Sequence, residues 1–144
     1  MVGIEAEGHA LGWVAVTRPV EGDLYLSLRN PRVTPMSMFW HSNGGRDYAP
    51  WSGRHFGCLG VEEGAAAHML GLSTEADLTG PGALALDPDG TTEVRHVIGA
   101  VAWPGGDPVA ELVLDGDSLL ITGEEGGMRR IPFDAGFLRL EGLV

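Results

Sequence analysis

The sequence predicts an all-β protein, an antiparallel β-sandwich that forms a single domain over residues 1–144. Turn signals rich in glycine, proline and aspartate recur at about the 8–12-residue spacing that is typical of β-sandwiches. The segments between these turns are rich in β-branched and aromatic residues, and only one short stretch has a helical composition. The 23 glycines and 9 prolines also favour many turns over long helices.

The first elements are expected to be a hairpin and a third strand. Residues 10–18 (ALGWVAVTR) end before Pro19, and residues 24–28 (LYLSL) follow the turn at residues 21–23. Such a pair separated by a short turn predicts two antiparallel strands. After two prolines that interrupt the chain, a third strand is expected over residues 36–41.

The middle of the chain is expected to be mostly irregular. Residues 46–57 follow a Ser-Asn-Gly-Gly turn signal and show no clean period, so they predict a loop over a sheet. Residues 58–61 (CLGV) predict a short strand. The alanine-rich residues 64–72 are the one plausible helical turn, and residues 73–82 predict a polar connector.

The second half predicts a series of strands joined by tight turns that contain glycine or proline. The expected strands are residues 83–86, 91–103, 109–114, 118–122, 128–133 and 137–144. The chain opens close to a strand with no obvious cap for the sheet edge, and exposed edges are usually covered or paired. We therefore expect half of a larger sheet, a homodimer, or aggregation through the open edge.

Charge and composition limit which binding partners and which cellular compartment are expected. The net charge of −11 predicts no binding to nucleic acid or to anionic membranes. No apolar run approaches the roughly 20 residues of a membrane helix. The first residues do not resemble a signal peptide. Cys58 is the only cysteine, so no internal disulfide is possible, and we expect a cytoplasmic protein.

Arginine is concentrated near the middle of this acidic chain. Residues 24–61 contain only one acidic residue, Asp47, but four arginines: Arg29, Arg32, Arg46 and Arg54. Arginine presents several donors in one plane, which suits a ligand rich in oxygen atoms. Ion pairing between these arginines and the acidic second half explains the pattern equally well.

Five of the ten aromatic residues lie between residues 38 and 64. Their rings suit the C–H faces of sugars, and nearby polar groups suit sugar hydroxyls, a mixture that is typical of small-ligand sites. The candidate substrate-binding residues are His41, Asn43, Arg46, Trp51 and Arg54. The alternative is a role in the core for Phe39, Trp40 and Phe56, which the sequence favours for Phe39 and Phe56. For Trp51, which follows a proline in an irregular segment, a core role and a binding role are equally compatible with the sequence.

His55 and Glu62 are the candidate catalytic residues. Histidine titrates near neutrality and acts as a general acid or base. Glu62 follows an apolar run, where burial would make it a stronger base. Strand alternation places Glu62 and Glu63 on opposite faces, so only one of them faces the site. A structural role for a lone histidine is the competing interpretation.

Other chemistries fit the sequence poorly. His41, His55 and Glu62 are too dispersed to predict a metal site, and no cofactor is expected. Cys58 lies in an apolar run, which argues against a reactive thiolate. The paired glycines at 44–45 lack the strand–loop–helix context of a phosphate-binding loop.

The segments SNGGRDYAPWSGRH and GCLGVEEG, and the later EVRHVIGAV, resemble the C-terminal half of the galactose mutarotase-like (aldose 1-epimerase-like) superfamily. This resemblance implies a β supersandwich that binds a sugar in a cleft, and relatives about twice as long. It also implies that a glutamate, matched by Glu62, deprotonates the anomeric hydroxyl. The family's acid histidine lies earlier in its chain and has no match here, so His55 is the best substitute and His41 the second.

Three functions follow from these observations. The first is an aldose 1-epimerase-like isomerase that acts on a sugar or a sugar derivative through acid–base ring opening. The second is a non-catalytic carbohydrate-binding β-sandwich with the same cleft. The third is a truncated structural fragment whose aromatic loop packs against a missing partner.

Overall fold

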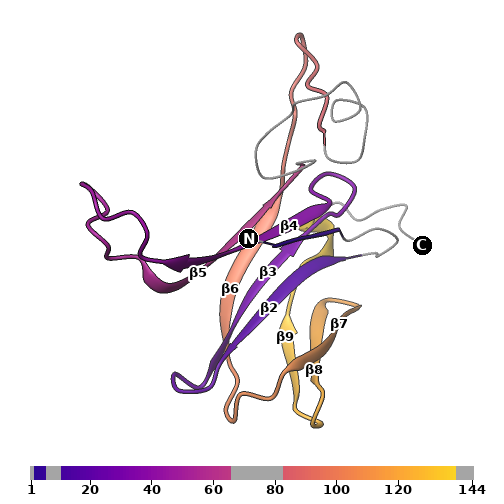
Figure 1. Cartoon of the computed structure of the whole chain (residues 1–144). Helices are drawn as coiled ribbons and strands as arrows, with labels where there is room; N and C mark the ends of the chain where they lie inside the picture. Colours follow the sequence, from indigo (N-terminus) through magenta and orange to yellow (C-terminus); the bar gives the residue numbers. More distant parts are fainter. Residues whose placement is uncertain (1, 6–10, 66–82, 139–144) are drawn as a thin grey trace. The chain divides into compact units, whose positions relative to one another are not determined.

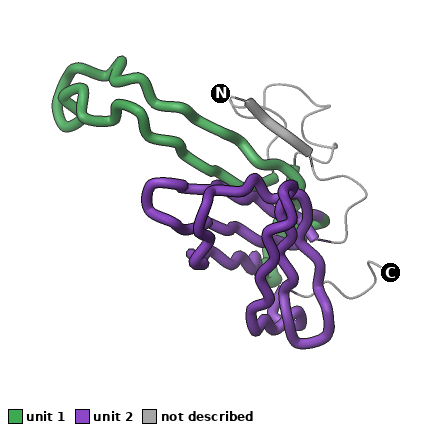
Figure 2. The backbone as a smooth tube through the Cα atoms, turned by 90° about the horizontal axis from the view of Figure 1, so that it is seen from below, with its two compact units in different colours: residues 1–7, 32–92 green, residues 8–31, 93–144 purple. Residues whose placement is uncertain are grey.

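The computed structural model describes residues 2–5, 11–65 and 83–138, and it confirms an all-β fold (Figure 1). All of its paired strands are antiparallel, in three sheets of three strands each. The chain divides into two compact units (Figure 2). The first unit comprises Met1–Glu7 and Arg32–Thr92, and the second comprises Gly8–Pro31 and Glu93–Val144. The single domain stays a prediction.

The first unit contains one sheet with the strand order β1-β4-β5. Its central strand is β4 (Met36–Asn43), which pairs with β1 (Val2–Glu5) and with β5 (Phe56–Gly64). The β4–β5 hairpin confirms the two strands that the sequence predicted on either side of an aromatic loop. β1 has only four residues and was not predicted from the sequence.

The second unit contains two sheets, with the strand orders β2-β3-β6 and β7-β8-β9. Their strands are β2 (Gly12–Arg18), β3 (Asp23–Arg29), β6 (His96–Ala102), β7 (Val109–Asp115), β8 (Ser118–Gly123) and β9 (Met128–Pro132). The predicted hairpin over the first two of these strands is confirmed, and so are the three consecutive strands of the last sheet.

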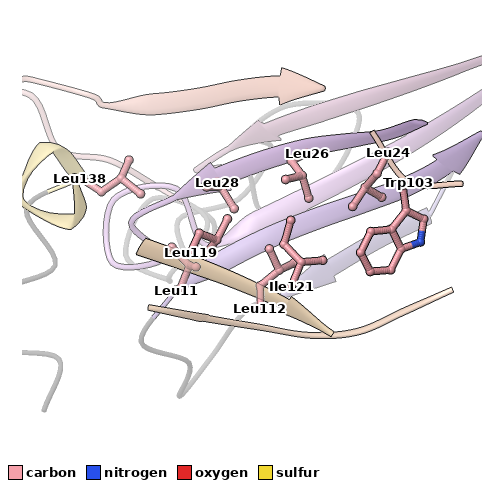
Figure 3. Packing of buried hydrophobic residues seen from close by; sticks show 9 residues of the cluster. All are labelled: Leu11, Leu24, Leu26, Leu28, Trp103, Leu112, Leu119, Ile121 and Leu138. Carbon is pink, nitrogen blue, oxygen red and sulfur yellow. The ribbon is translucent and has the colours of Figure 1, made fainter. Parts of the chain in front are cut away.

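The core of the second unit lies between its two sheets (Figure 3). Leu24, Leu26 and Leu28 alternate along β3, so all three point to the same face of the sheet. They pack in one cluster with Leu119 and Ile121 of β8, which are fully buried. The two sheets therefore form a sandwich within this unit.

Three expected elements differ from the structure. Residues 83–86 form no strand, because no described strand pairs with them and Leu84 and Leu86 are exposed. The long strand expected over residues 91–103 begins only at His96. The expected final strand begins instead as a 3-10 helix, Ala135–Leu138. The remainder of that strand, most of the helical turn at 64–72 and the connector at 73–82 lie outside the described residues.

Asp107 joins the chain after β6 to the turn between β8 and β9. Its carboxylate accepts backbone hydrogen bonds from Glu125 at 2.9 Å and from Gly127 at 2.8 Å. Its carbonyl oxygen accepts a hydrogen bond from the indole N–H of Trp103, at 2.6 Å. One side chain thus satisfies two turn amides.

Replacing Asp107 with alanine should lower the free energy of unfolding by about 1–3 kcal/mol, because two amides lose their acceptor. Chemical denaturation measures the change. Glu124→Ala, in the same turn, is the matched control and should have little effect, since the Glu124 side chain is exposed. Equal losses in the two variants would contradict a specific role for the Asp107 carboxylate.

Candidate functional site

A cleft of about 590 Å³ lies within the first unit, where the β4–β5 hairpin meets its loop. The residues that line it are Trp40, His41, Ser42, Asn43, Gly44, Gly45, Arg46, Trp51, His55 and Glu62. Six of the seven predicted binding or catalytic residues are among them. Trp40, Ser42, Gly44 and Gly45 also line the cleft and were not among the predicted site residues; the first two belong to β4, and the glycines follow it directly.

The strands place one indole ring and one carboxylate on the same side of the hairpin. Trp40 pairs with Gly60, and Met38 pairs with Glu62, so Trp40 and Glu62 lie on one face. A Cβ atom at Gly60 would lie 3.4 Å from the Trp40 ring, so the glycine gives the ring room to lie across β5. Trp40 is therefore half-buried against its own hairpin and also lines the cleft.

The loop at residues 44–55 is closed by hydrogen bonds between its own backbone groups. Gly44 donates to the carbonyl of His55 at 3.2 Å, and Gly53 donates to that of Arg46 at 2.8 Å. Both glycines have a positive φ, 69° and 67°, which side chains rarely tolerate. These bonds hold Arg46 and His55 in place relative to the strands.

Three side chains of the loop contact one another at the cleft, and we call them the Arg46–Trp51–His55 cluster. The ring centroids of Trp51 and His55 are 4.9 Å apart, in an edge arrangement. The Arg46 guanidinium carbon lies 5.3 Å from the Trp51 ring centroid, a cation–π distance. The cluster orders an otherwise polar loop around a half-buried indole ring.

Arg54 is the one predicted site residue that the structure does not bring to the cleft. Its guanidinium donates to the carbonyl of Pro50 at 2.7 Å and to that of Trp51 at 3.4 Å. Arg54 therefore supports the turn that carries Trp51.

Glu62 and Glu63 lie on opposite faces, as the sequence predicted. Glu62 lines the cleft, whereas Glu63 accepts a hydrogen bond from the Ser37 hydroxyl at 3.5 Å. The expected burial of Glu62 is wrong, because this part of β5 leaves its side chain exposed.

The expectation that Phe56 lies in the core is also wrong, because Phe56 is 73% exposed. Cys58 is exposed although it lies in an apolar run. The register shifts by one residue between His41 and Asn43, and Gly57 has a positive φ in the same region. This bulge changes the alternation of side chains at the start of β5. Phe39, in contrast, is half-buried.

The arginines of the central stretch occupy different environments. Arg29 is only 2% exposed and thus forms no part of a surface patch. Arg46 and Arg54 are exposed, and within the described part of the chain neither forms an ion pair with a carboxylate. Arg18 does form such a pair, with Asp23, and the hydrogen bond to that carboxylate raises the arginine's pKa.

Over residues 2–5, 11–65 and 83–138, no group of three or more His, Cys, Asp or Glu residues is arranged to hold a metal ion. No helix in this same part of the chain has the length and apolar character needed to cross a membrane. No family model, curated protein or solved structure matches the chain.

Proposed function

We propose that the cleft of the β4–β5 hairpin binds a carbohydrate. The observation that carries this proposal is that two indole rings, Trp40 and Trp51, line one open cleft together with several polar side chains. A ligand with both C–H faces and many hydroxyl groups matches this mixture of surfaces.

The polar groups of the cleft include both donors and acceptors, and a sugar hydroxyl can form hydrogen bonds with both. The Arg46 guanidinium only donates, the Glu62 carboxylate only accepts, and the Asn43 amide does both. Both charged groups are exposed, and within the described residues neither is engaged by an ion-pair partner. Their hydrogen-bonding capacity is therefore available to a ligand.

Replacing Trp51 with alanine should weaken sugar binding about 10-fold or more, because a large aromatic contact at the centre of a site often accounts for 2 kcal/mol or more. Calorimetric titration with a panel of hexoses measures the affinity, and thermal unfolding measures the stability. Tyr48→Ala is the matched control, since Tyr48 is 59% exposed on the same loop and does not line the cleft.

A specific loss in the Trp51 variant with normal unfolding would support the site. If Trp51→Ala unfolds the protein, or if Tyr48→Ala weakens binding equally, the assignment of the site is wrong.

An aldose 1-epimerase-like isomerase is the second candidate function. It is favoured by one observation, that His55 and Glu62 line the same cleft. In such an enzyme Glu62 takes the proton of the anomeric hydroxyl while His55, or His41 in its place, protonates the ring oxygen. The ring opens, the C1–C2 bond rotates, and closure from the other face gives the other anomer.

A further inference from the structure

From the charges of the cleft we infer, on the basis of the proposed function, that the carbohydrate is anionic and that Arg46 binds its carboxylate or phosphate group. Arg46 lines the cleft and is exposed. Within the described residues it has no carboxylate partner, in a chain with 20 acidic and 9 basic residues. A guanidinium that is left unpaired in so acidic a protein is suited to an anion supplied by a ligand.

The position of Arg46 prepares it for this role. Its backbone carbonyl accepts the hydrogen bond from Gly53, and its guanidinium lies over the Trp51 ring. This contact leaves the guanidinium N–H groups without a carboxylate partner among the described residues, and these groups form the fork that matches a carboxylate or a phosphate. Less side-chain freedom is then lost when the anion binds.

The surroundings of Arg46 leave space for an anion. Gly44 and Gly45 also line the cleft, and a Cβ atom added at Gly45 would meet no atom of the described residues within 4 Å. Among the described residues that line the cleft, Glu62 is the only one with a carboxylate. Because Glu62 repels anions and accepts from hydroxyl groups, we expect the charged group of the ligand at Arg46 and a hydroxyl-bearing part at Glu62.

The experiment compares three ligand classes on the intact chain by calorimetry: neutral hexoses, the corresponding hexuronic acids, and hexose 6-phosphates, with inorganic phosphate as a separate probe. We expect one anionic class to bind about 10-fold more tightly than the neutral sugars, since hydrogen bonds between charged groups are about twice as strong as neutral ones. The tighter of the two anionic classes identifies the source of the anion.

Arg46→Gln should reduce the affinity for the anionic sugar about 10-fold more than the affinity for the neutral one, and Arg46→Lys should recover part of the difference. Arg130→Gln is the matched control. It removes the same charge from an exposed arginine outside the cleft, one that pairs with Asp115, and the preference for anionic sugars should persist.

The outcomes separate the two proposals. Equal affinity for neutral and anionic sugars would overturn the anionic ligand while leaving carbohydrate binding intact, and so would an unchanged preference in Arg46→Gln. If no sugar of any class binds, the proposed function itself fails. The same conclusion follows if inorganic phosphate binds as tightly as the sugar phosphates and neutral sugars do not bind.

Discussion

In the proposed epimerase, Glu62→Gln is expected to lower the rate of catalysed anomer exchange about 10²–10⁴-fold, the usual effect of removing a general base. Glutamine keeps the shape of the side chain but cannot accept the anomeric proton. Glu62 is exposed to the cleft, so a bound sugar reaches it directly. Polarimetry on freshly dissolved sugars measures the rate above the spontaneous background.

Glu63→Gln is the control for this experiment, and it should leave the rate unchanged. Glu63 is the next residue of the same strand, but it faces the other side, where its carboxylate accepts from Ser37. Equal losses in the two variants would contradict the assignment of faces. Wild-type exchange at the background rate, with sugar binding intact, would reject the epimerase and leave the non-catalytic carbohydrate-binding protein.

Ile121→Ala is expected to lower the free energy of unfolding by about 2–5 kcal/mol, the range for removing a large aliphatic side chain from a core. Ile121 is fully buried and belongs to the cluster between the two sheets of the second unit. Neighbouring strands restrict how far the space can close after the side chain is removed. Urea denaturation monitored by circular dichroism measures the change.

Ile98→Ala is the matched control, because it makes the same chemical change in the same unit at a side chain that is 64% exposed. Its cost should be well below that of Ile121→Ala. Similar costs for the two variants would contradict the placement of the core between the two sheets.

The sequence predicted most strands of the second unit because each is short, alternates in polarity and is bounded by strong turn signals. The alternation of Leu24, Leu26 and Leu28 alone indicates which face of β3 carries the apolar core side chains. Local sequence does not indicate whether residues 83–86 pair with another strand, because strand formation depends on a partner supplied by another part of the chain. The same limit explains why β1 was missed.

The candidate site could be predicted largely because its residues lie close together in the sequence. A hairpin loop brings Arg46, Trp51 and His55 near one another in any closed arrangement. Composition could not reveal that Arg54 turns to backbone carbonyls, or that a bulge exposes Phe56. Both depend on hydrogen bonds and on register. The mutarotase resemblance, the homodimer and the cytoplasmic location stay predictions.

The most direct test of carbohydrate binding at the cleft is an NMR titration that follows the indole N–H signals of the four tryptophans. Trp40 and Trp51 line the cleft, whereas Trp13 packs against the core of the second unit and Trp103 is buried there. We expect a sugar that binds to shift the Trp40 and Trp51 signals in a saturable manner, while Trp13 and Trp103 stay unchanged. Saturable binding that leaves Trp40 and Trp51 unmoved, or that moves Trp13 or Trp103 instead, would contradict a sugar site in the β4–β5 cleft.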